Sequence, residues 1–162
     1  NELCAFTEEY QDGFKAISIL IDSGASDSVA PPETFPEINI FETTASRAGL
    51  QYTAAGGEKI RNQGMCRPVI QTTDGLTHSM AFQVAAVSKP LGAVSRIVGA
   101  GNRVVFDDKD GVGSYIQNRK TGKCTPLRQN NGVYYLDVWM KPGDGLDAKG
   151  NRVYTGFHRQ GS

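Results

Sequence analysis

The sequence has little cysteine and histidine, and these residues are poorly placed for cross-links or metals. Its three cysteines, Cys4, Cys66 and Cys124, are an odd number at wide spacing, and only two histidines accompany them. Neither a disulfide framework nor a Cys-x-x-Cys metal knuckle follows from that spacing. We therefore expect a reducing, intracellular compartment and no bound metal.

Long hydrophobic runs are also missing. No apolar stretch approaches the length that spans a bilayer, and the first residues do not form a secretory signal. A membrane is therefore not an expected partner. The 162 residues, 39% of them hydrophobic and 21% charged, fit one ordinary globular domain or a domain with an appendage. Because the first residue is Asn rather than Met, we expect a domain that comes from a longer polypeptide.

Common cofactor and hydrolase motifs are absent as well. Residues 121–124, Thr-Gly-Lys-Cys, lack the earlier glycine and the final Ser or Thr of a Walker loop. Residues 99–101 follow an expected helix, whereas a dinucleotide-binding loop would open one. No Gly-x-Ser-x-Gly elbow occurs, and the acids within residues 107–110 lack EF-hand spacing. We therefore expect no cofactor.

Basic side chains are scarce at the start of the chain. Residues 1–42 contain nine acids and only Lys15 as a base, a balance of −8, and the rest of the chain carries +8. Two interpretations of this uneven charge are open. The acidic and basic residues could simply form two solvated faces, or the opening segment could repel anions that the later part of the chain tolerates. Residues 96–128, with seven bases and three acids, are a weak candidate for nucleic-acid contact, so a nucleic acid is not an expected partner.

What the sequence does contain is a succession of short β-branched segments separated by turns. Residues 14–21 have isoleucine at alternate positions near their end, which predicts a half-buried strand. A Gly-rich hairpin is expected over about residues 50–65. One helix is expected to open at Pro90 and to cover residues 91–99, where apolar residues recur at helical spacing. Further strands are expected at residues 66–72, 77–87, 103–106, 114–118 and 132–139.

The stretch ISILIDSGASDSVAPP, residues 17–32, places an acid directly after the first of these strands. Amide hydrolysis needs a base for the water and an acid for the amide, and two carboxylates that share one proton serve both roles. Asp22 is expected at a rigid strand end, and Ser23, Gly24 and Ala25 are small enough for a second loop to pack there. The chain has one such motif, so a two-acid mechanism needs a second copy on a two-fold axis.

Two plainer interpretations of these acids stay open. Asp22 could simply begin an Asx turn, as most strand-end aspartates do. Asp27, five residues further on, could be taken for the second acid of the pair. The two acids of a catalytic pair need separately supported loops, however, so we expect Asp27 to form a local bond.

The motif and its neighbours resemble the retropepsins, the dimeric aspartic proteases of retroelements. The resemblance rests on ILIDSGA, on the Gly-rich hairpin, and on the apolar-Gly step Pro90-Leu91-Gly92 before a helix. Further on, PLGAVSRIVGAGNRVVFDDKDG, IQNRKTGKCTPL and NGVYYLDVW look like the segment that follows the protease in copia-type retrotransposon polyproteins. The resemblance covers roughly residues 14–140. It implies a mainly all-β, closed-barrel acid protease fold with one short C-terminal helix and additional C-terminal strands.

The resemblance also implies roles for individual residues. Asp22 would be the catalytic acid of each protomer, with Ser23, Gly24 and Ala25 supporting the active-site loop. The expected flap tip, which closes over an extended peptide, consists of Thr53, Ala54, Ala55, Gly56 and Gly57. The chain departs from the family pattern twice: Ser23 stands where Thr is frequent, and the arginine that usually follows the apolar-Gly step is missing. Arg96, one helical turn further on, is the expected substitute.

These expectations define domains and a function. Residues 1–102 are expected to form the protease domain, residues 103–140 a β-rich extension like the segment before integrase, and residues 141–162 a flexible tail. The expected function is that of an aspartic endopeptidase, active as a homodimer, that cuts extended peptides of a retroelement polyprotein in the cytoplasm or in retroelement particles. The alternative is a catalytically inactive retropepsin-like module for dimerisation or peptide binding.

Overall fold

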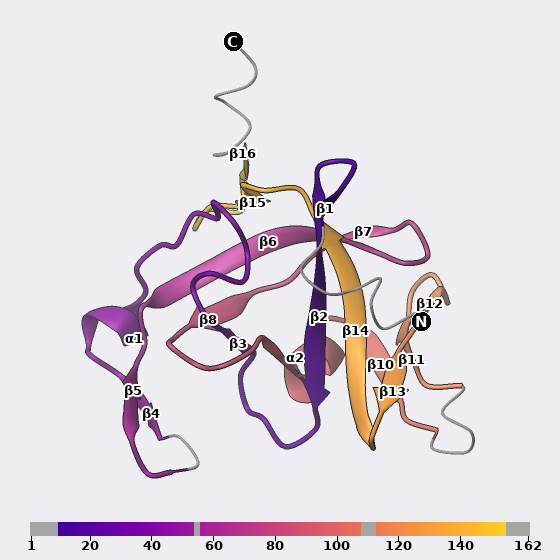
Figure 1. Cartoon of the computed structure of the whole chain (residues 1–162), viewed down its shortest axis with the longest axis horizontal. Coiled ribbons are helices and arrows are strands. Elements are labelled where there is room, and N and C mark those ends of the chain that lie inside the picture. The colour runs from indigo at the N-terminus through magenta and orange to yellow at the C-terminus, as the bar shows by residue number, and fades with distance from the viewer. Residues whose placement is uncertain (1–9, 54–55, 108–112, 155–162) are drawn as a thin grey trace.

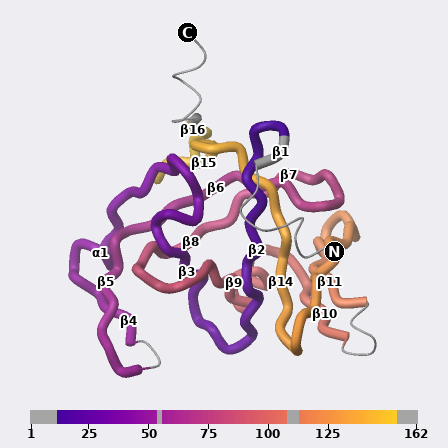
Figure 2. The backbone as a smooth tube through the Cα atoms, in the orientation of Figure 1, coloured from indigo at the N-terminus to yellow at the C-terminus, as the bar shows by residue number. Residues whose placement is uncertain are grey.

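The computed structural model describes residues 10–53, 56–107 and 113–154, and its main feature is a β-barrel (Figure 1). Strands make up 47% of the structure and helices 7%, and six of the strands form the closed barrel. The expectation of a mainly β domain with a closed barrel is thereby confirmed. Figure 2 traces the backbone in the same orientation. Among the described residues, no helix has both the length and the apolar character needed to cross a bilayer.

The six barrel strands follow one another in the order β14–β2–β9–β3–β8–β6, and β6 pairs with β14 to close the ring. Their bounds are Phe14–Asp22 for β2, Val29–Ala30 for β3, Gly64–Thr72 for β6, Phe82–Val84 for β8, Leu91–Ala93 for β9 and Val133–Met140 for β14. Most neighbours are antiparallel, but β9 runs parallel to β2 and β8 runs parallel to β3. The carboxyl ends of β2 and β9 therefore lie together at one end of the barrel.

Shorter elements are attached to this barrel. The strands that extend its sheet are β1 (Tyr10–Gln11), β7 (Thr77–Ser79), β13 (Arg128–Asn130), β15 (Asp144–Leu146) and β16 (Arg152–Tyr154). A hairpin of β4 (Gln51–Thr53) and β5 (Lys59–Arg61) and a small sheet of β10 (Asn102–Val105), β11 (Tyr115–Asn118) and β12 (Cys124–Pro126) lie on opposite sides of the barrel in Figure 1. The described residues form two helices, α1 (Thr44–Arg47) and α2 (Val94–Gly99).

The isoleucines of β2 form part of the barrel core. Ile17, Ile19 and Ile21 are 5%, 0% and 5% exposed, as their alternation in the sequence predicts. They belong to one hydrophobic cluster that includes Phe35 and Phe82, whose ring centroids lie 4.9 Å apart. Burial of each such side chain contributes about 1.5–3 kcal/mol. The strand that ends at the candidate catalytic acid is thus a firmly held part of the molecule.

The strand β14 pairs with β2 over seven residues, from Tyr134 opposite Ile21 to Met140 opposite Lys15. It also pairs with β6 and so completes the barrel. Further along the chain, β15 pairs with β6, and β16 pairs with β15. The division of the chain after residues 102 and 140 stays a prediction, but these pairings place β14, β15 and β16 in the same sheet as the strand that carries Asp22.

A partly buried ion pair joins β13, β14 and β2. Arg128 Nε donates to Asp137 Oδ2 at 2.8 Å, and its Nη2 donates to Oδ1 at 2.9 Å. Ser18 Oγ donates to the same Oδ1 at 2.7 Å, and Asp137 is 7% exposed. The bond to Asp137 raises the pKa of Arg128. Paired hydrogen bonds of this kind are directional, so they help to fix the register of β14 on β2.

The helix α2 begins later than the sequence predicts. The expected helix over residues 91–99 is wrong at its start, because Leu91–Ala93 is a strand and the helix covers Val94–Gly99. β9 pairs with β2 on one edge and with β3 on the other. These tertiary hydrogen bonds outweigh the local helical spacing of the apolar residues. Helix α1 and strands β12 and β13 are not among the expected elements.

The cysteines of the described chain are unpaired. Cys66 is buried in the core and Cys124 is exposed, and both are free thiols. Burial raises the pKa of Cys66 to about 12. Its thiol is therefore protonated and unreactive at neutral pH. Cys4 lies outside the described residues.

Replacing Asp137 by Ala is expected to destabilise the fold by about 2–3 kcal/mol, because the Arg128 guanidinium would be left partly buried without its carboxylate. Urea denaturation followed by the fluorescence of Trp139, the single tryptophan, measures the change. Glu33→Ala, at an exposed position, is the control and should stay within about 0.5 kcal/mol of the parent chain. Equal stabilities of the two variants would contradict the role given to the ion pair.

Candidate functional site

Asp22 is the last residue of β2, at the end of the barrel where β2 and β9 run in parallel. It lies opposite Ala93 in that pairing. From Asp22 the chain continues through residues 23–28 and returns as β3, whose Val29 pairs with Leu91. β9 therefore lies between the two strands that begin and end this loop. We call residues 22–28 the Asp22 loop.

Gly92 makes the close approach of β9 to β2 possible. A Cβ at this position would lie 3.2 Å from Cδ1 of Ile21 and 3.3 Å from Cγ2 of Ile19, closer than side chains normally come. With a Cβ here, the isoleucine side chains of β2 would have to shift by a few tenths of an ångström. The apolar-Gly step of the sequence thus has a physical role, because Gly92 leaves room for the buried isoleucines of the strand that ends at Asp22.

The Asp22 carboxylate is half-buried, and one of its oxygens is already bonded. Oδ1 accepts the backbone N–H of Gly24 at 2.8 Å, so the Asx-turn interpretation holds for this oxygen. Among the described residues, Oδ2 has no hydrogen-bond partner. Ser23 is exposed and also lacks a partner within the described part of the chain. Both polar groups are therefore available to a second molecule.

The far end of the Asp22 loop is held from inside the protein. Ser28 is 4% exposed, and its Oγ accepts the backbone N–H of Ala93 at 2.9 Å. Arg96 Nε donates to Asp27 Oδ1 at 2.9 Å. This second contact is largely exposed, with 64% of the arginine side chain accessible. Arg96 thus braces the loop of its own chain, and Asp27 makes the local bond that the sequence analysis expected.

The predicted hairpin is present. Its strands β4 and β5 pair antiparallel, and Thr53 is the last residue of β4. Gly56 and Gly57 are exposed, and Gly57 has φ 88°, a backbone conformation that favours glycine. Ala54 and Ala55 of the expected tip lie outside the described residues.

A buried asparagine, which the sequence analysis missed, fixes the base of this hairpin. Asn62 is 0% exposed. Its Nδ2 donates to Tyr52 Oη at 3.0 Å and to Gln83 Oε1 at 2.8 Å. Its Oδ1 accepts the N–H of Gly64 at 2.7 Å. Only the contact with Gly64 is local in the sequence. The sequence therefore offers one weak sign of this role, an Asn two residues before a Gly.

The base of the hairpin also lies close to the Asp22 loop. Burial raises the pKa of Tyr52, the hydrogen bond from Asn62 lowers it, and the negative charge of Asp27 raises it further. Hydrogen bonds connect the two segments: Asn62, which bonds to Tyr52, also bonds to Gln83, and the backbone N–H of Gln83 donates to the Ser28 carbonyl at 2.9 Å. The hairpin and the loop therefore border the same region.

Three further side chains lie as follows. His78 lies on β7 and is half-buried. Tyr134 packs against Phe106 with ring centroids 4.6 Å apart. The guanidinium carbon of Arg128 lies over the ring of Tyr135, 4.8 Å from the ring centroid. In the part of the chain that the structure describes, no three His, Cys, Asp or Glu side chains are grouped as a metal site.

Comparison with known proteins adds no identification. No family model, curated protein or solved structure matches the chain. The resemblance to retropepsins therefore stays a prediction, and the function has to be inferred from the geometry of the site.

Ser28→Ala is expected to destabilise the protein by about 1–2 kcal/mol, because the Ala93 N–H would be left buried without an acceptor. Arg96→Ala should cost less than about 1 kcal/mol, because its ion pair is exposed and screened by solvent. Urea denaturation of the two variants measures the difference. A larger loss for Arg96→Ala would contradict this account of how the Asp22 loop is held.

Asn62→Leu is expected to loosen the base of the hairpin, because three hydrogen bonds are lost together. Amide hydrogen exchange in β4 and β5 should accelerate by about tenfold or more. Tyr52→Phe removes only one of the three bonds and serves as the control, with little change expected. The same exchange rates in both variants would show that Asn62 does not fix the hairpin.

Proposed function

We propose that the chain is a retropepsin-like aspartic endopeptidase that acts as a homodimer, with Asp22 of each copy supplying one of the two catalytic carboxylates. The position of Asp22 carries this proposal. It is a carboxylate at the end of a buried barrel strand, with one oxygen held by the Gly24 N–H and the other without a partner among the described residues. An acid held in this way has a fixed position and can still bond to water.

The proposed chemistry needs two such acids close together. Two carboxyls that meet on a two-fold axis share one proton, because a second negative charge at short distance is strongly disfavoured. The ionised carboxylate takes a proton from water as the water oxygen bonds to the peptide carbonyl carbon, and the protonated one gives its proton to the carbonyl oxygen. Proton transfer to the amide nitrogen and return of a hydroxyl proton to the pair then accompany cleavage of the C–N bond.

The hairpin of β4 and β5 is the element suited to cover a substrate. Its base is fixed to the barrel by Asn62, whose partner Gln83 bonds to Ser28 of the Asp22 loop, whereas Gly56 and Gly57 near its tip are exposed. In the proposal, an extended peptide lies between this hairpin and the paired Asp22 loops. The backbone of the peptide pairs with strand edges, and closure of the hairpin excludes water from the reaction.

The start of the Asp22 loop is the surface proposed for contact with a second copy. Ser23 and Gly24 are exposed there, whereas Ser28 at the other end is buried. A second copy packed on this surface brings two Asp22 side chains together and gives Ser23 a hydrogen-bond partner. Arg96 is bonded to Asp27 of its own chain, so the proposed dimer rests on the loops and not on an arginine that reaches across.

The alternative is a catalytically inactive module of the same kind, which dimerises or binds peptides. The observation that favours it is the hydrogen bond from Gly24 to Asp22. That bond gives the aspartate a structural role that needs no catalysis. Under this alternative, replacing Asp22 changes stability or association, but there is no activity to lose.

Asp22→Asn is expected to lower cleavage of a peptide fused to the chain by about 10²–10⁴-fold, because an amide cannot accept the proton of the attacking water. Asp27→Asn in the same loop is the matched control, since an amide oxygen still accepts a hydrogen bond from Arg96. It should keep most of the activity. Unchanged processing by the Asp22→Asn chain would show that the endopeptidase proposal is wrong.

A further inference from the structure

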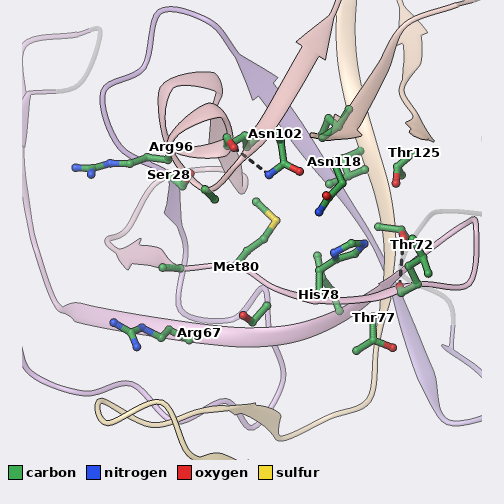
Figure 3. Close-up of a pocket in the computed structure, with 18 of the residues that line it drawn as sticks. Ser28, Arg67, Thr72, Thr77, His78, Met80, Arg96, Asn102, Asn118 and Thr125 are labelled. Carbon is green, nitrogen blue, oxygen red and sulfur yellow. Dashed lines mark hydrogen bonds between the residues drawn. The ribbon is translucent and has the colours of Figure 1, made fainter. Parts of the chain in front are cut away.

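A second concave site lies between the β6–β7 hairpin and the small sheet of β10–β12. Its volume is about 810 Å³, within the range of about 300–1,000 Å³ that is usual for ligand sites. Figure 3 shows His78 and Met80 pointing into it, with Asn102 and Asn118 on the opposite side. Of the described residues that line it, none belongs to β4 or β5, and Asp22 is not among them. We call this site the sheet cleft.

The edge of β7 beside the sheet cleft has backbone groups that the sheet does not use. Among the described strands, β7 pairs only with β6. Met80 N–H donates to the Pro68 carbonyl at 3.2 Å, and residues along an antiparallel strand alternate between bonding to the neighbour and facing away from it. Thr77 and Ser79 therefore direct their N–H and C=O groups away from β6. Both are exposed and line the cleft, so an extended peptide can pair with this edge as an additional strand.

Two asparagines on the small sheet have side-chain amides of fixed orientation. Asn102 and Asn118 lie opposite each other on β10 and β11. Asn118 Oδ1 accepts the N–H groups of Lys120 and Thr121, each at 2.9 Å, and Asn102 Nδ2 donates to the Ile97 carbonyl at 3.0 Å. Within the part of the chain that the structure describes, Asn118 Nδ2 has no hydrogen-bond partner. It is therefore available as a donor to an acidic group.

The charge of the sheet cleft also favours an acidic ligand. Its lining includes the bases Arg67, Arg96 and Lys123 and one acid, Asp27, which is already bonded to Arg96. Lys123 is exposed and forms no ion pair with any described residue. The Asn118 N–H donates to the Lys123 carbonyl at 2.9 Å, so both residues belong to one turn. An acid bound at this end of the cleft meets a positive charge and an amide donor together.

The remaining lining is apolar but includes no aromatic ring. Met80, Ile97 and Ile116 contribute apolar surface, and no Phe, Tyr or Trp is among the described residues that line the cleft. Single-stranded nucleic acids are usually held by stacking of bases on aromatic side chains as well as by basic groups. The cleft therefore suits an apolar side chain next to an acid better than it suits a nucleic acid.

We propose that the sheet cleft is a docking site for an extended segment of another protein, which pairs with the edge of β7 and places a large apolar and an acidic side chain in the cleft. Alternate side chains of a strand share one face and lie about 6.8 Å apart. The apolar side chain packs on Met80, Ile97 and Ile116, and the acid bonds to Asn118 and Lys123. This docking is independent of whether Asp22 is catalytic.

Titration of the isotope-labelled full chain with blocked peptides, followed by NMR, tests the proposal. Acetyl-Ser-Leu-Ser-Glu-Ser-amide and acetyl-Ser-Glu-Ser-Leu-Ser-amide carry the two side chains at alternate positions, one peptide for each strand direction. Acetyl-Ser-Ser-Leu-Glu-Ser-amide has the same composition but places them on opposite faces of a strand. We expect one of the first two peptides to bind about tenfold more tightly than the third and to shift the amide resonances of Thr77 and Ser79.

Variants of the chain test the two ends of the contact. Ser79→Pro removes a backbone N–H that points away from β6, and proline is tolerated on a free strand edge. It should weaken binding by about five- to tenfold, whereas Ser79→Ala keeps the N–H and should bind as the parent chain does. Lys123→Glu should weaken binding by about tenfold. Lys120→Glu, at an exposed residue that does not line the cleft, is its matched control and should change binding by less than about twofold.

Several results would overturn the proposal. Equal affinity for the three peptides, unchanged binding by the Ser79→Pro or Lys123→Glu chain, or resonance shifts at Gly56 and Gly57 in place of β7 would each do so. Displacement of the peptide by a short oligothymidylate would assign the surface to nucleic acid instead. The Asp22→Asn chain should bind the peptides as the parent chain does, so a failure of the proposed catalysis and a failure of this docking site are separate results.

Discussion

The parallel contact between β9 and the end of β2 is the constraint on which the candidate site depends. Gly92 has no side chain, so the buried Ile19 and Ile21 side chains of β2 have room beside β9, which pairs with β2. On its other edge, β2 pairs with β14 over seven residues. β2 is therefore held on both edges by segments far away in the sequence. Asp22 at its end gains a fixed position that a free loop would not provide.

The elements that the sequence predicts correctly have local causes. Alternating isoleucines place one side of β2 in the core, and a Gly-rich turn predicts the hairpin of β4 and β5. The features that it misses have distant causes. β9 is a strand and not the first turn of a helix because β2 and β3 pair with it. Asn62 takes two of its three partners, Tyr52 and Gln83, from other strands, so its role is visible only after folding.

The two ends of the Asp22 loop have different surroundings, and each end therefore suits a different role. At the start of the loop, Asp22 and Ser23 have polar groups without partners in the described chain, which suits contact with a second copy and a substrate. At the far end, Ser28 and Asp27 are bonded to β9 and α2. We infer that the start of the loop faces another copy of the chain, whereas its far end is held from inside the protein.

The central claim, that two Asp22 carboxyls from two chains form one active site, is tested most directly by mixing. Wild-type and Asp22→Asn chains are combined in varying proportion at constant total concentration, under conditions in which subunits exchange, and cleavage of a peptide substrate is measured. If each active site needs one Asp22 from each of two copies, activity falls as the square of the wild-type fraction. Activity that falls in simple proportion to that fraction would contradict a shared site.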